Sequence, residues 1–368
     1  MLDVLVAATI QAVLCLPGLI VYILFMSTVA SSPTLRRNPF FILALSLGLC
    51  DIISLCVVVF YTLPCTIWQA QIGGYFISAL FGWVYSVGWY SQFPNMIFLA
   101  INRYFAILKA RANYESRFSR QTLHLLVCVS WVIGVLLCAP SLSSCCYLVY
   151  FPQMFTWMYI RTTGGYMMLK MDITVTTMTA LVVTCFNGIV FCDIWQKHRQ
   201  MAASINQTVH VSRRRKREQQ LFFQFFIITS WLFLFDLVFS LLPLVMKHYY
   251  AGVIISTMQG VNHSINGFVY CIMNSQIRDS IKCLHRPPEN SDATGVRSDQ
   301  AAGRGTNSGT LMGTSSRTVS RTQSHVLQGE GFQNTHKLAY QHCMNISNQL
   351  KIFLLGSMQL PLINQRTI

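Results

Sequence analysis

The sequence predicts an all-α membrane protein, a bundle of seven transmembrane helices with its N-terminus outside the cell and its C-terminus in the cytosol. Three observations support this prediction. The composition is 53% hydrophobic and only 11% charged, whereas soluble domains carry about 25% charged residues. Seven apolar runs are each long enough to cross a bilayer, which takes about 20 residues. Lys and Arg gather in alternate segments between those runs.

The seven apolar runs follow one another with short or moderate linkers. They cover residues 4–29, 40–63, 76–108, 123–142, 173–195, 221–246 and 251–273. The third run is long enough to require tilt or to extend beyond the bilayer. The first run lacks a basic leader and a small-residue cleavage site, so we expect a retained helix and not a removed signal peptide. Kinks or helix ends are expected at Pro64, Pro94, Pro140 and Pro243.

The distribution of Lys and Arg fixes the predicted orientation. The segments after the first, third and fifth runs, counted together with Arg103 at the inner end of the third run, hold 14 of these residues, whereas the N-terminus and the segments after the second, fourth and sixth runs hold 3. The positive-inside rule places the basic side in the cytosol. The net charge of +15 comes in short clusters between apolar runs, which favours contact with the membrane surface over nucleic acid.

The chain changes character after the seventh run. Residues 275–284 are amphipathic and are expected to lie along the inner membrane surface, which completes one membrane domain over residues 1–284. Residues 285–368 include a stretch rich in Gly, Ser, Thr and Arg, which predicts a disordered cytosolic tail. Its serines and threonines are candidate kinase targets, and a solvated linker is the alternative. We assign no role to the apolar segment 351–363.

Polar groups inside the predicted spans are candidates for function, because lipid cannot satisfy them. Asp51 lies halfway along the second span. Asn262, Asn266 and Tyr270 share one face of the seventh span. We therefore expect Asp51, Asn262 and Asn266 to form a buried polar network that could be hydrated or hold a cation. Static packing is the alternative.

Arg103 ends the third apolar run and must face protein or water at that depth. Glu218 stands at the cytosolic foot of the sixth span and is a plausible partner for Arg103, with a solvated charge as the alternative. Farther out, a ligand pocket could be lined by side chains that otherwise serve only packing. The pocket candidates are Trp83, Tyr90, Trp231 and Asp236.

Most of the 13 cysteines lie inside apolar runs, where they act as small buried hydrophobic residues. No pair has zinc-ligand spacing, so neither a metal site nor a cofactor is predicted. On the oxidising side, Cys65 could pair with Cys145 or Cys146. Cys283, in the amphipathic segment, is a candidate for palmitoylation, and a free thiol is the alternative.

Two short motifs lie on the third and seventh predicted spans. They are Asn102-Arg103-Tyr104 at the inner end of the third span and Asn266-Gly-Phe-Val-Tyr270 in the seventh. With them the chain resembles the rhodopsin-like G-protein-coupled receptors, and within that class it is most similar to the nematode serpentine chemoreceptors of class x. The supporting residues are Ala100-Ile101-Asn102-Arg103-Tyr104-Phe105-Ala106-Ile107, Trp131, Arg213-Arg214-Arg215-Lys216-Arg217-Glu218 with Phe222-Phe223-Gln224, and His263, Gly267 and Asn274.

The resemblance implies a receptor that binds a small extracellular ligand and opens a cytosolic groove to a heterotrimeric G protein. It also implies location in the plasma membrane, including the sensory cilium. The basic loops could contact the G protein or anionic membrane lipid, and phosphates on the tail could recruit a receptor kinase or arrestin as partner. The residues expected to form the signalling switch are Asn102, Arg103, Tyr104, Glu218, Asn266 and Tyr270.

The chain departs from the family pattern at several positions. Asn102 replaces the usual acid before the arginine, so the local charge pair is missing. Gly267 replaces the proline of the seventh span. Ser78 stands where many relatives carry the cysteine of the common extracellular disulfide. The route of coupling to a G protein therefore stays open.

A transporter or ion channel is the alternative function. It would need a polar path across the bundle, and transporters often show paired interrupted helices and internal symmetry, neither of which is visible. An enzyme is not predicted, because the sequence lacks a GxS nucleophile motif, HExxH and paired catalytic aspartates.

Overall fold

The structure, a computed structural model, describes residues 2–108, 114, 117–202, 223–224, 226–235, 237–239, 242 and 248–284. The chain divides into two units, Met1–Pro287 and Pro288–Ile368, and the described residues all belong to the first. The predictions for Glu218, for Asp236 and for the tail after residue 284 lie outside the described residues.

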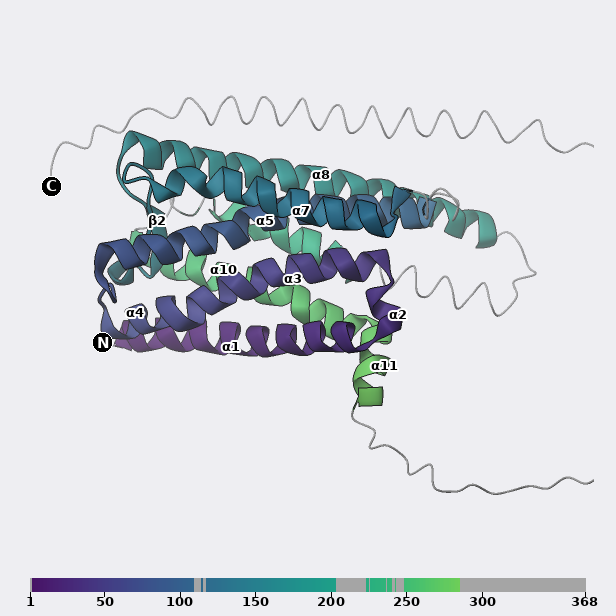
Figure 1. The fold of residues 1–368 in the computed structure, drawn as a ribbon, viewed down its shortest axis with the longest axis horizontal. Helices are drawn as coiled ribbons and strands as arrows, with labels where there is room; N and C mark the ends of the chain where they lie inside the picture. The colour runs from purple at the N-terminus through teal and green to yellow at the C-terminus, as the bar shows by residue number, and fades with distance from the viewer. Residues whose placement is uncertain are drawn as a thin grey trace, which may run out of the picture. The chain divides into compact units, whose positions relative to one another are not determined.

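Long helices make up the first unit (Figure 1). They correspond to the predicted spans, and the sixth span is described only in part, between residues 223 and 242. The helices are α1 (Leu2–Ser31), α2 (Pro33–Arg36), α3 (Pro39–Val57), the π-helical turn η1 (Val58–Thr62), α4 (Leu63–Trp68), α5 (Gly74–Leu108), α7 (Arg120–Cys138), the 3-10 turn η2 (Ala139–Leu142), α8 (Thr163–Ala202), α10 (His248–Met273) and α11 (Ser275–Leu284).

Hydropathy separates these helices into two groups. In the described part, four segments are long and apolar enough to cross a membrane: Asp3–Ser31, Pro39–Trp68, Arg120–Leu142 and Thr163–Gln196. Helices α5 and α10 have the length but carry more polar side chains, and the bundle buries many of these, including Gln92, Asn95, His263 and Asn266. Helix α5 packs against α3, α7 and α8, so its polar groups face protein and not lipid.

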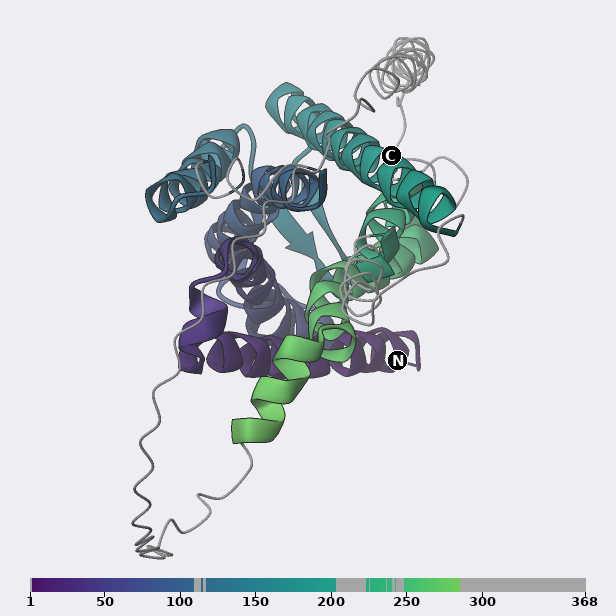
Figure 2. The same cartoon turned by 90° about the vertical axis from the view of Figure 1, so that its right-hand side faces the viewer.

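A β-hairpin, which the sequence patterns do not predict, follows the fourth span. Strand β1 (Leu148–Phe151) pairs antiparallel with β2 (Thr156–Tyr159), with Tyr150 opposite Trp157, and the 3-10 turn η3 (Pro152–Met154) connects them. Viewed along the helices, the strands lie inside the bundle (Figure 2). The hairpin is at the end of the unit that holds the N-terminus (Figure 1), which the distribution of Lys and Arg assigns to the outside.

Close backbone contacts fix the hairpin against two helices. A Cβ atom at Gly82 of α5 would overlap the carbonyl oxygen of Leu148, and one at Gly252 of α10 would overlap that of Met154. The backbone N–H of Tyr150 donates a 3.0 Å hydrogen bond to Ser78 Oγ. A hydrogen bond therefore joins α5 to the hairpin at Ser78.

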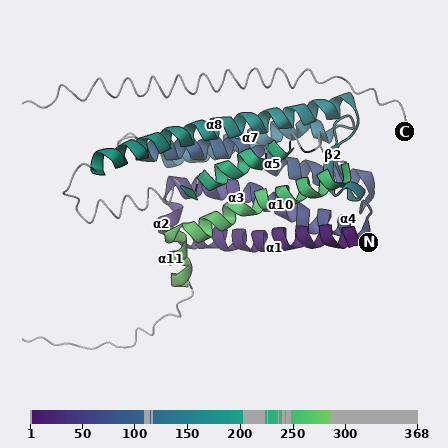
Figure 3. The ribbon, with the colours of Figure 1, turned by 180° about the vertical axis from the view of Figure 1, so that it is seen from behind.

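Helix α10 lies along α1, and α11 turns away from it at the end opposite to the hairpin (Figure 3). The α10–α1 contact is close because a Cβ at Gly267 would lie 3.1 Å from the ring of Tyr22. Gly267 thus makes room for Tyr22, whose hydroxyl reaches the polar site of the bundle.

Candidate functional site

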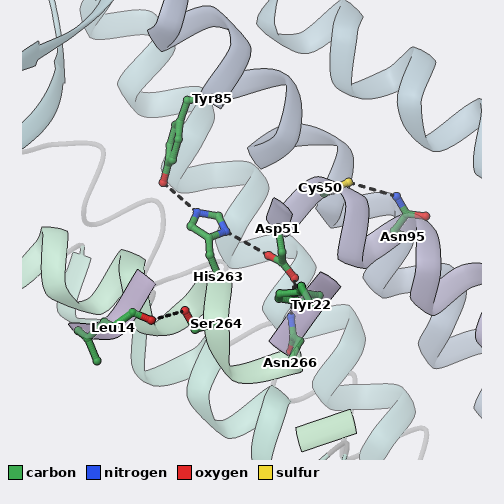
Figure 4. Close-up of polar contacts among 9 residues, drawn as sticks. All are labelled: Leu14, Tyr22, Cys50, Asp51, Tyr85, Asn95, His263, Ser264 and Asn266. Atoms are coloured by element: carbon green, nitrogen blue, oxygen red, sulfur yellow. Dashed lines mark hydrogen bonds and ion pairs between the residues drawn. The ribbon is translucent and has the colours of Figure 1, made fainter. Parts of the chain in front are cut away.

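Asp51 is the centre of a hydrogen-bonded group that joins three helices (Figure 4). Its side chain is completely buried. The Tyr22 hydroxyl of α1 and Asn266 Nδ2 of α10, at 3.2 Å, both donate to Asp51 Oδ2. His263 Nδ1 of α10 lies 3.1 Å from Oδ1. Donors therefore surround the carboxylate, as a buried charge requires.

His263 extends this group towards the outside. Its Nε2 lies 3.0 Å from the Tyr85 hydroxyl of α5. A neutral imidazole with its proton on Nδ1 satisfies both contacts, because it donates to Asp51 and accepts from Tyr85. The Trp89 ring also meets the imidazole edge to face, with 5.8 Å between ring centroids. His263 thus contacts two aromatic side chains of α5 and the central carboxylate.

Tyr85 connects His263 to the hairpin. Its ring stacks on Trp157 of β2, with centroids 5.7 Å apart and planes 11° apart. The Tyr150 hydroxyl of β1 lies 2.6 Å from Thr66 Oγ1 of α4, which also fixes the hairpin to the bundle. A contiguous series of contacts therefore runs from Trp157 through Tyr85 and His263 to Asp51.

The series continues towards the cytosolic end along α10. Tyr270 lies one helical turn after Asn266, and its ring stacks on Phe25 at 5.3 Å and meets Phe40 edge to face at 5.9 Å. The guanidinium carbon of Arg103 lies 3.7 Å from the centroid of the Phe40 ring, which is the geometry of a cation–π interaction. Arg103 is only 7% exposed. We call the contacts from Trp157 to Arg103 the contact chain.

The remaining switch candidates are placed around Arg103. Asn102 Nδ2 donates to the Tyr114 hydroxyl at 3.2 Å, so Asn102 holds the side chain of Tyr114. Tyr104 points to α8, where its ring meets Phe186 edge to face. The predicted partner Glu218 lies outside the described residues.

The predicted polar network needs one correction. Asp51 and Asn266 are in contact, as predicted, but Asn262 does not take part. Its Nδ2 is buried and has no hydrogen-bond partner among the described residues. Neighbouring helix positions point about 100° apart, and His263 is the one whose ring reaches Asp51. The sequence contained a signal for it, since positions 263, 266 and 270 follow helical spacing.

Outside this network, α5 carries a second buried polar cluster beneath the hairpin. Trp89 Nε1 donates a 2.7 Å hydrogen bond to Asp172 Oδ1 of α8, and the hydroxyls of Tyr90 and Tyr159 lie 3.1 Å apart. Phe235 of the sixth span packs against Trp89. Of the pocket candidates, Tyr90 belongs to this cluster. Asp172 is not among the residues predicted from the sequence, because it directly precedes the apolar run that begins at residue 173.

Trp83 and Trp231 are the other pocket candidates among the described residues. Trp83 and Trp231 are half-buried, and their indole nitrogens have no hydrogen-bond partner among the described residues. A cavity with room for about one water molecule lies deeper in the bundle, between Tyr270 and apolar side chains of other helices. It is lined by Leu47, Met96, Leu99, Val183, Ile228, Thr229, Leu232 and Tyr270, so the predicted pocket residues do not form it.

The predicted disulfide is not formed. Cys65, Cys145 and Cys146 are free thiols. Cys65 is completely buried in α4, where its sulfur accepts from the backbone N–H of Ile72, whereas Cys145 and Cys146 lie against Gly164. The side chain of Cys283, the palmitoylation candidate, lies outside the described residues.

Known proteins are similar to this chain in sequence and in fold. The sequence model of the family described as "Serpentine type 7TM GPCR chemoreceptor Srx" matches residues 13–274. The neuropeptide S receptor of Macaca mulatta is 24% identical over 236 residues, which cover 56% of this chain and 59% of that receptor. The chain therefore spans less than two thirds of the length of this relative.

The fold is similar to the crystal structure of squid rhodopsin. The TM-score is 0.60 at 14% sequence identity, and the match covers 75% of this chain and 83% of the rhodopsin chain. The likeness concerns the fold alone, a bundle of seven transmembrane helices. Since the family match extends over most of the chain, the protein belongs to the Srx family of serpentine seven-transmembrane chemoreceptors, which are multi-pass membrane proteins.

Proposed function

We propose that the protein is a G-protein-coupled receptor that binds a small ligand from outside the cell and activates a heterotrimeric G protein. The contact chain is the observation that supports this function. It connects the hairpin, where a ligand would arrive, with Arg103 at the cytosolic end, through side chains of α5, α3 and α10.

The ligand site that we propose lies beneath the hairpin. Rings of Trp89, Tyr90, Phe93 and Tyr159 gather there, together with the Asp172 carboxylate. A ligand that inserts at this place displaces Tyr85 or Trp89, and both of these contact His263. The position of His263 is therefore sensitive to the ligand from two sides.

Activation then follows from a shift between two arrangements of the bundle. A ligand changes their populations only by the difference in its affinity for them. In the arrangement described here, Tyr85 and Asp51 hold His263, and Phe40 packs beneath Arg103. We propose that displacement of His263 loosens α10 around Asn266 and Tyr270, so that Phe40 and Arg103 separate and the cytosolic side opens to a G protein.

Signalling in intact cells tests this function. Cells that express the full-length receptor are screened with volatile and water-soluble compounds, and cAMP, cGMP and calcium are recorded. Arg103→Ala should abolish the response while the number of receptors at the surface stays normal. Tyr85→Phe keeps the ring but removes the hydrogen bond to His263, and should lower ligand potency by roughly fivefold or more. The matched control is Tyr75→Phe, because Tyr75 is an exposed tyrosine at the outer end of α5.

Full signalling by Arg103→Ala would exclude the switch. Ion current or solute flux in proteoliposomes that contain no G protein would instead favour a transporter or channel.

We further propose that the receptor works in the plasma membrane of a sensory cilium, that its basic loops contact anionic lipid, and that a receptor kinase and arrestin act on the tail. Fluorescence imaging of the tagged receptor tests the location.

A further inference from the structure

Two adjacent cysteines lie together at the base of the hairpin. Cys145 is exposed and Cys146 is 6% exposed. Both sulfurs rest on Gly164, because a Cβ atom built there would lie 2.5 Å from Cys146 Sγ and 3.1 Å from Cys145 Sγ. The Ser143 hydroxyl lies 3.0 Å from Cys145 Sγ. The two thiols therefore share one small site that the contact chain does not use.

Hydrogen bonds make the two thiols chemically unequal. The neighbouring Cys146 thiol, and then the Ser143 hydroxyl 3.0 Å from the sulfur, lower the pKa of Cys145. The same contact with Cys145, together with burial, raises the pKa of Cys146. A thiolate is the nucleophile in exchange with disulfides. By its exposure and its lowered pKa, Cys145 is therefore the better placed of the two sulfurs to attack a disulfide that arrives from outside.

The pair also lies where both ends of the hairpin meet. The backbone N–H of Ile160 donates to the carbonyl oxygen of Tyr147 at 3.0 Å, and the Thr162 hydroxyl donates to that of Cys145. The distribution of Lys and Arg puts this loop outside the cell, where disulfides form and persist. An oxidant therefore reaches Cys145 directly.

We propose that Cys145 and Cys146 form a reversible vicinal disulfide when a low-molecular-weight disulfide oxidises them from outside. The Cys145 thiolate attacks one sulfur of the oxidant, its S–S bond breaks, and the first small thiolate leaves. Cys146 gives its proton to that thiolate and attacks Cys145, and the second small thiolate leaves and takes up a proton. Two protein thiols are oxidised, and one small disulfide is reduced to two thiols.

Geometry explains why this bond would be reversible. The Cα atoms of adjacent residues are about 3.8 Å apart, whereas ordinary disulfides join Cα atoms about 4.4–6.8 Å apart. A bond outside that range is strained and easily reduced. The inference requires only that the loop faces outside, so it succeeds or fails independently of G-protein coupling.

Mass spectrometry of the purified full-length receptor tests the proposal. The receptor is treated with oxidised glutathione, alkylated with N-ethylmaleimide and digested. In the wild type we expect the peptide with both cysteines to be two hydrogens lighter, unalkylated, and restored by a reductant. Cys146→Ser should accumulate a glutathione adduct on Cys145, because no resolving thiol remains. Cys145→Ser should leave Cys146 largely unmodified, and Cys65→Ser should behave like the wild type.

Three results would overturn the proposal. They are a cross-link from Cys65 to either cysteine, separate adducts on both cysteines, and two thiols that stay reduced and open to alkylation in the correctly folded wild type. Equal adduct formation on Cys145→Ser and Cys146→Ser would also contradict the division of roles between the two sulfurs.

Discussion

The middle of the contact chain, around Asp51, and its cytosolic end, around Arg103, are built from different interactions. Around Asp51, hydrogen bonds dominate: the carboxylate receives donors from Tyr22 and Asn266, and His263 bridges it to Tyr85. Around Arg103, ring contacts dominate, since the guanidinium lies over Phe40, which itself packs on Tyr270.

This difference indicates which of the two regions, around Asp51 or around Arg103, should move more easily. A hydrogen bond weakens steeply when its angle changes, so the group around Asp51 fixes one arrangement of α1, α3 and α10. A cation over a ring depends mainly on its distance from the ring face, so Arg103 can shift by small steps at low cost. We infer that ligand binding must break contacts around Asp51, whereas the region around Arg103 responds gradually.

Removal of the Asp51 carboxylate should have the largest effect. Asp51→Ala leaves the hydroxyl of Tyr22, the amide of Asn266 and the imidazole of His263 buried without their acceptor. Unsatisfied buried groups cost about 1–3 kcal/mol each, so the free energy of unfolding should fall by about 3 kcal/mol or more, measured as a lower Tm of the detergent-solubilised receptor.

Ser54→Ala is the matched control for this change. Ser54 lies one turn further along α3, is completely buried, and its hydroxyl has no hydrogen-bond partner among the described residues. Its Tm should remain close to that of the wild type. Equal losses in the two variants would show that α3 tolerates no truncation and that the donors around Asp51 have no special weight.

The hairpin contact offers the second largest effect. Gly252→Ala places a methyl group on the carbonyl oxygen of Met154, which the backbone must move to avoid, at a cost of about 1–3 kcal/mol. Amide hydrogen exchange in the hairpin should become faster. Gly188→Ala on α8 meets nothing within 4 Å, so it should leave the exchange unchanged. Unchanged exchange in Gly252→Ala would mean that the hairpin is not seated against α10.

Sequence patterns predicted the helices well because span length and hydrophobicity are local properties. They also predicted the Asp51–Asn266 contact, since a buried carboxylate and an amide on an inward face have few other partners. The hairpin was missed because residues 148–159 are nearly continuous apolar and aromatic, without an alternating pattern or a strong turn signal.

Long-range contacts set a different limit on prediction from sequence. Tyr22 looked like any packing aromatic, because only the tertiary fold shows that its hydroxyl reaches Asp51. Phe40 begins α3 as an ordinary apolar residue, and nothing local indicates that Arg103 lies over it. The preference for Asn262 over His263 rested on helical spacing alone, and a rotation of one position along α10 decides between them.

At the inner end, Phe40→Leu should raise signalling in the absence of ligand. It keeps an apolar side chain but removes the ring face beneath Arg103, and such a contact is worth about 0.5–2 kcal/mol. Basal activity should therefore rise by roughly twofold to thirtyfold, measured as second messenger per surface receptor. The control is Phe41→Leu, a buried neighbour whose ring packs edge-on against Phe40. A larger rise in the control would remove Phe40 from the switch.

The smallest effect is expected from a substitution at the thiol pair, which lies outside the regions around Asp51 and Arg103. The Ser143 hydroxyl supports the lowered pKa of Cys145, so Ser143→Ala should raise that pKa. A thiol with a lowered pKa stays ionised at lower pH, so loss of the hydrogen bond should move the onset of alkylation to higher pH and slow it several-fold at neutral pH. Ser144→Ala serves as the neighbouring control. Because the loop lies apart from Asp51 and Arg103, neither variant should alter basal signalling, and a change in signalling would show that the hairpin base is coupled to the switch.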